Sequence, residues 1–489
     1  MDNLKKNAGG TLPATGKERG KGNPLVSYKF GADPYALVHK DRVYLYMTHD
    51  IPEYDEEGKL KENTYSRINK ITVLSSEDLI NWRDHGEIHA AGPEGAATWA
   101  TQSWAPAAAH TTIDGKDKFF LYFANNASGI GVLTSDSPEG PWVDPLGKAL
   151  ILRSTPGVSE VTWLFDPAVF VDDDGKAYIY FGGGIPDGQE EWPNTARVME
   201  LGPDMISVVG EARAIPAPFM FEDAGINKYG DQYYFTYCSN FFTGKRPEGC
   251  PPAGEIAYMT SEHPMGPWKY RGTILKNPGH FFGVGGNNHH AIFAFHDKWY
   301  IAYHAQTLSK AMGAPNGYRS THLNELTFSK ADGSIQEVQA DLEGVPPIKY
   351  FYPYELVKAA TTAWSAGIAV EPPASSGGTG EERVVGALAD GGWIGLSGVN
   401  FGHPGAQAVT ATVMGGAAPS VIELRLDHPD GMRIGSLHVP AADGIRSAGQ
   451  PAVLSAEVTG AEGIHDLYFV FRGEGDNKLL QMYDWQFRK

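Results

Sequence analysis

Residues 41–50 read DRVYLYMTHD, a charged turn followed by alternating aromatic and aliphatic residues. Alternation over this length predicts a β-strand. The same pattern returns in DKFFLYFANN from Asp117, GKAYIYFGGG from Gly175, DQYYFTYCSN from Asp231 and DKWYIAYHAQ from Asp297. Five copies of one local pattern indicate a chain built from repeated supersecondary units.

Each copy has a second short strand before it, and three copies have a similar segment after them. The preceding strands read GADPYALVHK, SWAPAAAHTT, FDPAVFVDDD, FEDAGINKYG and HHAIFAFHD. The following segments, SSEDLINWRDHG, SDSPEGPWVD and SEHPMGPWKY, share a turn of Ser with acidic residues and a Trp. One unit is therefore a hairpin with an outer strand. Five such units predict an all-β, five-bladed β-propeller over residues 25–345, after an N-terminal tail of residues 1–24.

The sequence changes in character beyond about residue 350. The stretch AVEPPASSGGTGEER (369–383) is rich in Pro, Gly and Ser, and the blade pattern does not return. Five shorter alternating segments follow, namely WIGLSGVNF, AVTATVMGG, SVIELRLDH, AVLSAEVTG and IHDLYFVFRG. Their spacing predicts a separate β-sandwich over residues 350–489.

Charge and composition exclude several classes of partner. The 58 acidic and 40 basic residues give a net charge of −18, which would repel a nucleic acid but not a neutral sugar. No stretch approaches the roughly 18 apolar residues of a membrane span. The first 24 residues lack the apolar core of a secretory signal, so we expect a cytoplasmic protein unless residue 1 is a mature N-terminus. The two cysteines, Cys238 and Cys250, are expected to be free thiols, and the oligomeric state stays open.

The innermost strand of each blade lines the central channel of a propeller. Aligning these strands brings five residues to the channel: Asp33, Trp104, Asp166, Glu222 and His290. Hydrolysis of a glycosidic bond needs two carboxyl groups, one to protonate the leaving oxygen and one to activate water or attack the sugar. A third carboxylate nearby would raise the pKa of the acid. An Asp before Pro is often only a turn residue, but three acids at equivalent positions favour catalysis.

The motifs GADPYAL, QSWAPAAAH, WLFDPAVFVDDDG, FEDAGI and GVGGNNHHAIF resemble glycoside hydrolase family 43. The resemblance covers roughly residues 24–345 and is nearest to the arabinoxylan arabinofuranohydrolase branch. It implies an inverting mechanism on a five-bladed propeller, without an organic cofactor. By the same resemblance Asp33 would be the general base and Glu222 the general acid. Asp166 would tune the pKa of that acid and help to hold the sugar.

The resemblance also implies a sugar pocket. Its aromatic residues would stack on sugar faces, and its polar residues would hydrogen-bond sugar hydroxyls. The aromatic candidates are Trp104, Trp163 and Phe241, and the polar candidates are Asn287, Asn288 and Arg319. For a single aromatic residue the alternative is core packing, and for Arg319 it is a solvated surface position.

His290 aligns with a histidine that is associated with calcium in the propeller channel of this family. Calcium prefers oxygen ligands, so a hydrogen-bonded core histidine is the alternative interpretation of His290. Its neighbour His289 should point to the other face of the strand.

The C-terminal part resembles carbohydrate-binding module family 6 in GGWIGLSGVNFG, IELRLDHPDG, GSLHVP and GIHDLYFVFRG. Three places depart from that family. Lys358-Ala359-Ala360 stands where Glu-Ala-Glu is usual, and Gln481–Trp485 (QMYDW) stands where the family ends in Asn-Phe-Asp-Tyr/Trp-Trp. The loop GIRSAG (444–449) lacks the usual aromatic residue. We therefore expect the module to keep its fold without binding sugar.

Together these features favour an exo-acting α-L-arabinofuranosidase that acts on arabinoxylan or its oligosaccharides. A β-1,4-xylosidase acting on xylo-oligosaccharides, or a bifunctional enzyme, is the nearest alternative. A non-catalytic sugar-binding propeller would be expected to lose one of the three acids. A retaining enzyme would place its carboxyl groups about 5–5.5 Å apart, against about 6.5–9.5 Å for an inverting one.

Overall fold

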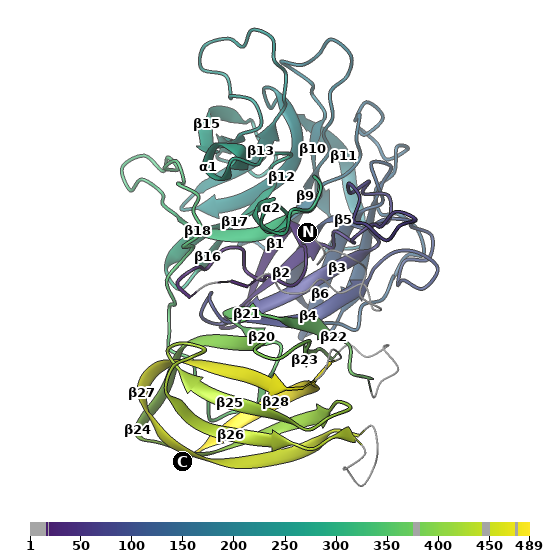
Figure 1. Cartoon of the computed structure of the whole chain (residues 1–489). Helices are drawn as coiled ribbons and strands as arrows, with labels where there is room; N and C mark the ends of the chain where they lie inside the picture. Colours follow the sequence, from purple (N-terminus) through teal and green to yellow (C-terminus); the bar gives the residue numbers. More distant parts are fainter. Residues whose placement is uncertain (1–15, 18, 375–381, 443–449, 475–477) are drawn as a thin grey trace.

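The computed structural model describes residues 16–17, 19–374, 382–442, 450–474 and 478–489. It confirms the predicted all-β architecture, a five-bladed propeller followed by a β-sandwich (Figure 1). The helices found in the described residues are short, α1 (Pro278–Phe282) and α2 (Thr307–Met312). No helix in these ranges is long and apolar enough to cross a membrane.

Each blade is an antiparallel sheet of consecutive strands. Blade 1 contains β1 (Ala32–His39), β2 (Arg42–Thr48), β3 (Lys70–Ser76) and β4 (Trp82–His89). Blade 2 contains β5 (Trp104–Ile113), β6 (Lys116–Ala124) and β7 (Ile130–Ser135). Blade 3 contains β8 (Ala168–Val171), β9 (Ala177–Phe181), β10 (Ala196–Leu201) and β11 (Val208–Ile215). Blade 4 contains β12 (Met220–Tyr229), β13 (Gln232–Ser239), β14 (Ile256–Ser261) and β15 (Lys269–Leu275). Blade 5 contains β16 (His290–Phe295), β17 (Lys298–Ala305) and β18 (Ser320–Leu326).

The repeated aromatic segment forms the second strand of every blade, namely β2, β6, β9, β13 and β17. These strands are buried along most of their length because neighbouring blades cover both faces. In the first three copies the Tyr at the sixth position also bonds to the following blade. The hydroxyls of Tyr46, Tyr122 and Tyr180 donate to the carbonyls of Pro138, Met205 and Pro264 at 2.6, 2.7 and 2.7 Å. The repeat therefore encodes contact between blades as well as strand formation.

The propeller is closed by the segment before β1. The amide of Leu25 donates to the Thr321 carbonyl at 2.9 Å, and the amide of Leu323 donates to Asn23 Oδ1 at 2.8 Å. Asn23 is buried. The last residues of the predicted tail thus pair with β18, whereas residues 1–15 and 18 of that tail lie outside the described residues.

The innermost strands leave regular β geometry at the end of the channel where they begin. Asp33, Ala105, Asp166 and Asp223 have φ values of 47, 41, 49 and 69°, in the left-handed region. Strand pairing shifts register near the first two of these residues and around Glu222. A bulge of this kind re-aims side chains and breaks the alternation of a strand.

The predicted alignment of the channel residues is therefore wrong by one position in two blades. Asp33 and Asp166 occupy the left-handed position, whereas Trp104 and Glu222 stand one residue before it. In blade 4 the left-handed position belongs to Asp223. Asp33, Trp104, Asp166 and Glu222 nevertheless all line the pocket at this end of the channel, whereas Ala105 and Asp223 do not.

The sandwich consists of β19 (Val357–Lys358), β21 (Trp364–Ala366), β22 (Ile368–Glu371), β23 (Val384–Ala387), β24 (Trp393–Gly415), β25 (Ser420–Leu426), β26 (Arg433–Val439), β27 (Ala452–Gly473) and β28 (Leu480–Arg488). The prediction of separate short strands is wrong for two of them. β24 contains both WIGLSGVNF and AVTATVMGG, and β27 contains both AVLSAEVTG and IHDLYFVFRG. Gly402 and Gly463 face each other with φ values of 65 and 80°, and the register shifts beside them. Glycine tolerates this geometry, so two long strands bend there without ending.

The sandwich continues a sheet of the propeller. The short strand β20 (Thr361–Thr362) pairs with Trp82 and Arg83 of β4 and so extends blade 1. Tyr28, which precedes β1, is buried in the hydrophobic core of the sandwich. The side chain of Arg383 reaches Glu87 of β4 at 2.9 Å. The two domains therefore pack as one continuous body through blade 1 (Figure 1).

The residues that depart from carbohydrate-binding module family 6 have structural roles. Lys358 Nζ lies 2.5 Å from Glu382 Oε1 and 3.6 Å from Asp484 Oδ2, and Trp485 is fully buried. Ala359 and Ala360 are also buried. The GIRSAG loop lies outside the described residues, and so does most of the segment 375–383.

Candidate active site

A pocket of about 440 Å³ lies at the channel end where the bulges are. Seven predicted site residues line it: Asp33, Trp104, Trp163, Asp166, Glu222, Asn287 and Arg319. Its wall also includes residues that the sequence did not single out, among them Tyr65, Asn126, Phe165, Phe221 and His289. Three predicted residues, Phe241, Asn288 and His290, are not part of this wall.

Asp33 is buried, and protein groups hold its carboxylate in place. Arg319 Nη1 donates to Asp33 Oδ1 at 2.8 Å. Burial alone would raise the pKa of Asp33, but Arg319, His289 and His304 together outweigh burial and hold this pKa well below its usual value. Asp33 is therefore a carboxylate that stays ionised throughout the neutral range.

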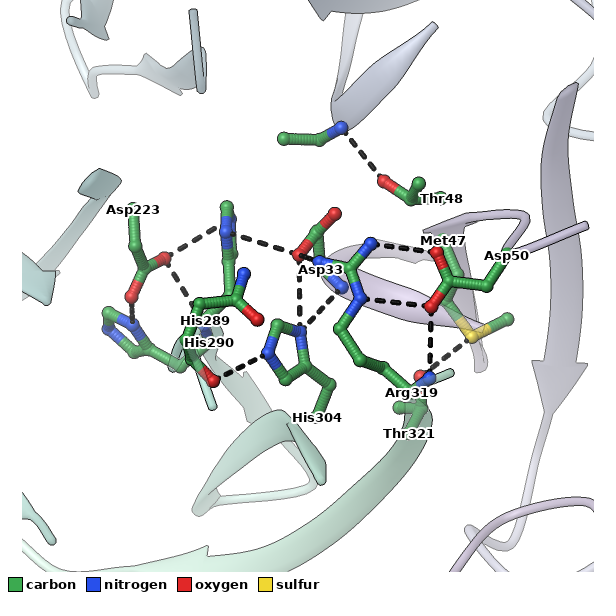
Figure 2. Close-up of polar contacts among 12 residues, drawn as sticks. Asp33, Met47, Thr48, Asp50, Asp223, His289, His290, His304, Arg319 and Thr321 are labelled. Atoms are coloured by element: carbon green, nitrogen blue, oxygen red, sulfur yellow. Dashed lines mark hydrogen bonds and ion pairs between the residues drawn. The ribbon is translucent and has the colours of Figure 1, made fainter. Parts of the chain in front are cut away.

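Arg319 is fixed by a second carboxylate on its other side. Its Nε and Nη2 donate to the two oxygens of Asp50 at 2.9 and 2.8 Å. The side chain is almost fully buried, and each of its nitrogens has a carboxylate partner. The burial of Arg319 rules out the solvated alternative, and its guanidinium orients Asp33. Arg319 also lines the pocket, so its contact with sugar hydroxyls stays a prediction. Figure 2 shows this chain of contacts from Asp50 through Arg319 to Asp33.

His304 contacts the backbone of Asp33. Its Nε2 lies 3.0 Å from the carbonyl of Asn287, and its Nδ1 lies 3.1 Å from the backbone nitrogen of Asp33. A neutral ring that donates through Nε2 to the carbonyl leaves Nδ1 as the acceptor for the Asp33 amide. His304 thus fixes the backbone of Asp33 in its left-handed conformation.

Glu222 and Asp166 have the opposite electrostatic setting from Asp33. Burial raises the pKa of Glu222 well above its usual value, and the charges of Asp166 and Asp33 add to this effect. Burial and Asp33 likewise raise the pKa of Asp166, whose Oδ2 accepts the Asp223 amide at 2.9 Å. Among the described residues, Glu222 Oε1 is buried without a hydrogen-bond partner. The two carboxyl groups therefore lose their protons at higher pH than Asp33, and the charge left by the first proton lost opposes the loss of the second.

His289 lies among the acids, contrary to the expectation that it points away from them. Its Nδ1 is 3.5 Å from Asp33 Oδ1 and its Nε2 is 3.2 Å from Asp223 Oδ1 (Figure 2). The same Nδ1 lies 3.8 Å from Asp166 Oδ2. His289 stands just before β16, where regular alternation has not begun. Burial lowers its pKa, so the neutral imidazole bridges two parts of the acid cluster.

His290 is buried below the pocket, and both of its ring nitrogens have protein partners. Nδ1 lies 2.5 Å from Asp223 Oδ2, and Nε2 lies 2.8 Å from Thr236 Oγ1. Burial lowers its pKa to about 3. The structure thus gives His290 the role of a hydrogen-bonded core histidine in place of a metal ligand.

Of the remaining sugar-binding candidates, Trp163 lies in the pocket wall, whereas Phe241 and Asn288 lie outside it. Trp163 packs edge-on against Phe165 and Phe221, with ring centroids 5.5 and 5.2 Å apart. Phe241 is 41% exposed and packs edge-on against the outer side of Phe221 at 5.5 Å. Asn288 is fully buried, and its Nδ2 donates to the Gly254 carbonyl at 3.2 Å. Asn288 is therefore placed to hold a loop and not to contact a ligand.

Two supporting residues could have been found in the repeat itself. His304 is the eighth residue of the fifth copy, where the other copies have Thr48, Ala124, Gly182 and Cys238. A bulky titratable residue among small ones at an inward position indicates a polar partner. Asp50 likewise ends the first copy, whereas the other copies end in uncharged residues.

One group of three potential metal ligands occurs in the described ranges, and it lies outside this pocket. It consists of His39, His110 and Asp117. Both ring nitrogens of His290 are already hydrogen-bonded, one to Asp223 and the other to Thr236. Calcium requires six to eight oxygen ligands, so the groups around His290 do not fit this ion.

These features define a class of protein before any comparison is made. A propeller pocket that holds an ionised carboxylate, a protonated carboxyl group and aromatic walls is suited to hydrolysing glycosidic bonds without a cofactor. Residues 22–335 match the family model of glycosyl hydrolases family 43, and residues 358–489 match carbohydrate binding module (family 6). The chain belongs to glycosyl hydrolase family 43.

Two relatives resemble nearly the whole chain. The arabinoxylan arabinofuranohydrolase of Paenibacillus polymyxa is 50% identical over 96% of this chain and 74% of its own length. The arabinoxylan arabinofuranohydrolase of Bacillus subtilis is 50% identical over 98% of this chain and 94% of its own. A Bacillus subtilis enzyme of that name, solved in complex with cellotetraose, aligns with a TM-score of 0.93 over 98% of this chain and 99% of that one.

A more distant relative carries two activities in its name. The xylosidase/arabinosidase 43A of Humicola insolens is 30% identical over 64% of this chain and 98% of its own length. This likeness is limited to part of the chain, whereas the two relatives above also match the C-terminal module.

Proposed function

We propose that this protein is an exo-acting α-L-arabinofuranosidase that releases arabinose from arabinoxylan or its oligosaccharides. The observation that carries the proposal is the opposite setting of two carboxyl groups in one pocket: Arg319 bonds to Asp33 and favours its ionised form, whereas Glu222 is buried without a hydrogen-bond partner for Oε1 among the described residues, which favours its protonated form. The choice of arabinoxylan is supported by two relatives of that specificity, each 50% identical to nearly the full chain.

The proposed reaction assigns one proton transfer to each of these residues. Glu222 donates its proton to the glycosidic oxygen as the bond from this oxygen to the anomeric carbon breaks. A water molecule bonds to that carbon and gives its proton to Asp33, so the product first appears with inverted configuration. Asp166 keeps the pKa of Glu222 high, because a second negative charge beside it disfavours ionisation.

No step of this proposal uses a metal. Calcium, which was expected at His290, has no role in the proposed mechanism. Both ring nitrogens of His290 already bond to Asp223 and Thr236.

The direct test compares the two sugars side by side. The purified protein is incubated with 4-nitrophenyl α-L-arabinofuranoside, with 4-nitrophenyl β-D-xyloside, and with arabinoxylan and linear xylo-oligosaccharides. The proposal expects preference for the arabinoside, and arabinose as the sugar released from the polymer. Release of xylose from linear oligosaccharides at a higher rate would make the protein a β-xylosidase. No hydrolysis of any substrate would leave it a sugar-binding propeller.

A further inference from the structure

A second hollow, of about 420 Å³, opens between two loops of blades 3 and 4. One loop connects β9 to β10, and the other connects β13 to β14. Both β9 and β13 run toward the catalytic end of the channel, because Gly183 just after β9 pairs with Trp163, and Cys238 of β13 pairs with Glu222. The hollow therefore lies on the same face of the propeller as the catalytic pocket.

Aromatic side chains form the body of this hollow. Phe219 is almost fully buried, with the Arg246 guanidinium 4.2 Å from its ring and the Phe242 ring stacked at 6.4 Å. Trp192 also lines the hollow and is 49% exposed. About half of the Trp192 indole is exposed to solvent, and the buried Phe219 ring lines the same hollow. The indole therefore offers a flat apolar face to a ligand.

Backbone hydrogen bonds fix the shape of the hollow. The amide of Phe219 donates to the Glu191 carbonyl at 2.8 Å. Asn240 Nδ2 donates to the carbonyl of Glu190 at 2.7 Å, and the Asn240 amide donates to the carbonyl of Phe219 at 2.6 Å. The loop that carries Trp192 is therefore tied to the start of β12 and to the end of β13, which lie side by side.

Polar side chains complete the lining. They are Gln189, Glu190, Glu191 and Lys245, which supply donors and acceptors beside the aromatic faces. A cavity of a few hundred cubic ångströms with aromatic walls and a few polar groups is typical of a small-ligand site. Because acidic and basic groups are mixed, the lining suits a neutral ligand rich in hydroxyl groups.

The hollow and the catalytic pocket are neighbours along one short piece of chain. Phe219 belongs to the hollow and Phe221 to the pocket, two residues apart and thus at most about 7 Å along the backbone. On the second loop, Phe242 lines the hollow while the adjacent Phe241 contacts the Phe221 ring. This distance is on the scale of one or two sugar residues.

We propose that Trp192 and Phe242 form a subsite for the β-1,4-linked xylose backbone of arabinoxylan, next to the pocket that receives the arabinose branch. This inference rests on the proposed function. When the arabinose branch occupies the catalytic pocket, the xylose backbone that carries it lies on the surrounding surface. The hollow adjoins the pocket on that surface. Backbone xylose is neutral and presents flat apolar ring faces edged by hydroxyl groups, which match the aromatic walls and the polar lining.

The test replaces the exposed indole and compares long with short substrates. Trp192→Ala should raise the KM for polymeric arabinoxylan about threefold to tenfold, as expected for the loss of one aromatic contact. The kcat/KM for 4-nitrophenyl α-L-arabinofuranoside should not change, because this substrate has no xylose backbone. Tyr352→Ala is the matched control, since Tyr352 is 59% exposed but lies outside both hollows. This control should leave both constants unchanged.

Two further variants keep the result interpretable. Phe242→Ala should repeat the effect of Trp192→Ala, and Trp192→Phe should restore most of the affinity because a stacking face remains. An unchanged KM on the polymer in both alanine variants, with normal hydrolysis of the nitrophenyl substrate, would refute the subsite alone. Failure of the unaltered protein to hydrolyse the nitrophenyl arabinoside would instead refute the proposed function.

Discussion

The propeller and the sandwich are both β-domains, yet they bury charged groups in different places. The propeller gathers ionisable side chains at the end of its channel, where Asp33, Asp166, Glu222 and Asp223 are all buried. In the described part of the sandwich the buried charged residues are Arg383 and Asp466. Arg383 binds Glu87 of blade 1, and Asp466 binds Arg19 of the segment before the propeller.

This difference separates the tasks of the two domains. Buried charges are costly unless they are paired or used, so their position indicates where a domain needs them. The propeller has a cluster of them at its pocket, where they can act on a substrate, besides buried charges elsewhere such as Lys29, Asp84 and Arg197. The sandwich keeps them at its contact with the propeller, which indicates docking as their role. Four predictions test this contrast, beginning with the largest effect.

The largest effect is expected at the catalytic acid. Glu222→Gln should lower kcat about 10²- to 10⁴-fold, because the amide cannot donate a proton to the leaving oxygen. The loss should be smaller with an activated nitrophenol leaving group than with arabinoxylan, since nitrophenolate needs little protonation. Steady-state kinetics on the two substrates measure the difference, and the unfolding midpoint checks that the fold is retained.

The sandwich provides the matched control for this change. Glu423→Gln alters a carboxylate whose side chain is 13% exposed and which binds Arg425 and Arg472. This variant should keep the activity of the unaltered protein. Equal losses on good and poor leaving groups in Glu222→Gln would remove Glu222 from the role of the acid.

The second effect concerns stability at the contact between the domains. Glu87 binds Lys29 at 2.6 Å and Arg383 at 2.9 Å, and Glu87→Gln should cost about 3 kcal/mol of unfolding free energy. Glu325→Gln, at an exposed pair with Lys298, is the control and should cost at most about 1 kcal/mol. Urea denaturation of the three proteins measures both changes.

The same residue predicts the acid limit of this stability. Burial would raise the pKa of Glu87, but the charges of Lys29 and Arg383 outweigh burial and hold it well below the usual 4.5. A carboxylate with a depressed folded pKa stabilises the protein above pH 4.5, and the contribution is lost as the pH falls further. The Glu87→Gln variant should lack this part of the acid dependence. An equally steep loss in both proteins below pH 4.5 would assign it to other groups.

The contrast between the domains also shows what a sequence can reveal. The aromatic repeat predicted every blade, because hydrophobic alternation is a local property with a clear period. The three acids were found because they stand near the start of equivalent strands. The prediction that the His289 side chain points away from the acids was wrong. It assumed that the alternation of a regular strand already applies at His289, but bulges break that alternation in this region.

Partners distant in the sequence were harder to predict. The role of Arg319 in holding Asp33 was missed because nothing near it in the chain shows that Asp50 and Asp33 lie beside it in the fold. In the sandwich, WIGLSGVNF and AVTATVMGG were predicted as separate strands, and so were AVLSAEVTG and IHDLYFVFRG. Gly402 and Gly463 lie in these breaks and face each other at a bend of two continuous strands. A glycine marks unusual backbone geometry, and the sequence alone does not tell a turn from a bend.

The third prediction concerns the pH profile. Burial and the charge of Asp166 both raise the pKa of Glu222, so Asp166→Asn should lower it and move the alkaline limb of kcat/KM to lower pH by about one unit. Asp172→Asn is the control from the same motif, because Asp172 binds Lys228 outside the pocket. An unchanged alkaline limb in Asp166→Asn would show that Asp166 does not tune the acid.

The smallest effect is expected for polysaccharide binding by the sandwich. Trp393 is partly buried against Tyr468, and Trp485 is fully buried. From β19 onward, the strongly exposed apolar residues in the described ranges are the aliphatic side chains of Met432, Val453 and Ile464. From β19 onward the described surface thus offers no exposed aromatic platform for a sugar ring, whereas the exposed Tyr350 and Tyr352 precede β19.

Trp393→Ala, combined with Glu222→Gln to prevent hydrolysis, should therefore change retention on insoluble arabinoxylan by less than about twofold. Trp192→Ala in the same inactive background should reduce retention more, since its indole is half exposed beside the catalytic pocket. Depletion of each protein from solution by the insoluble polymer measures both effects. If Trp393→Ala releases the protein while its unfolding midpoint is unchanged, the sandwich binds the polysaccharide and the division of tasks between the two domains is wrong.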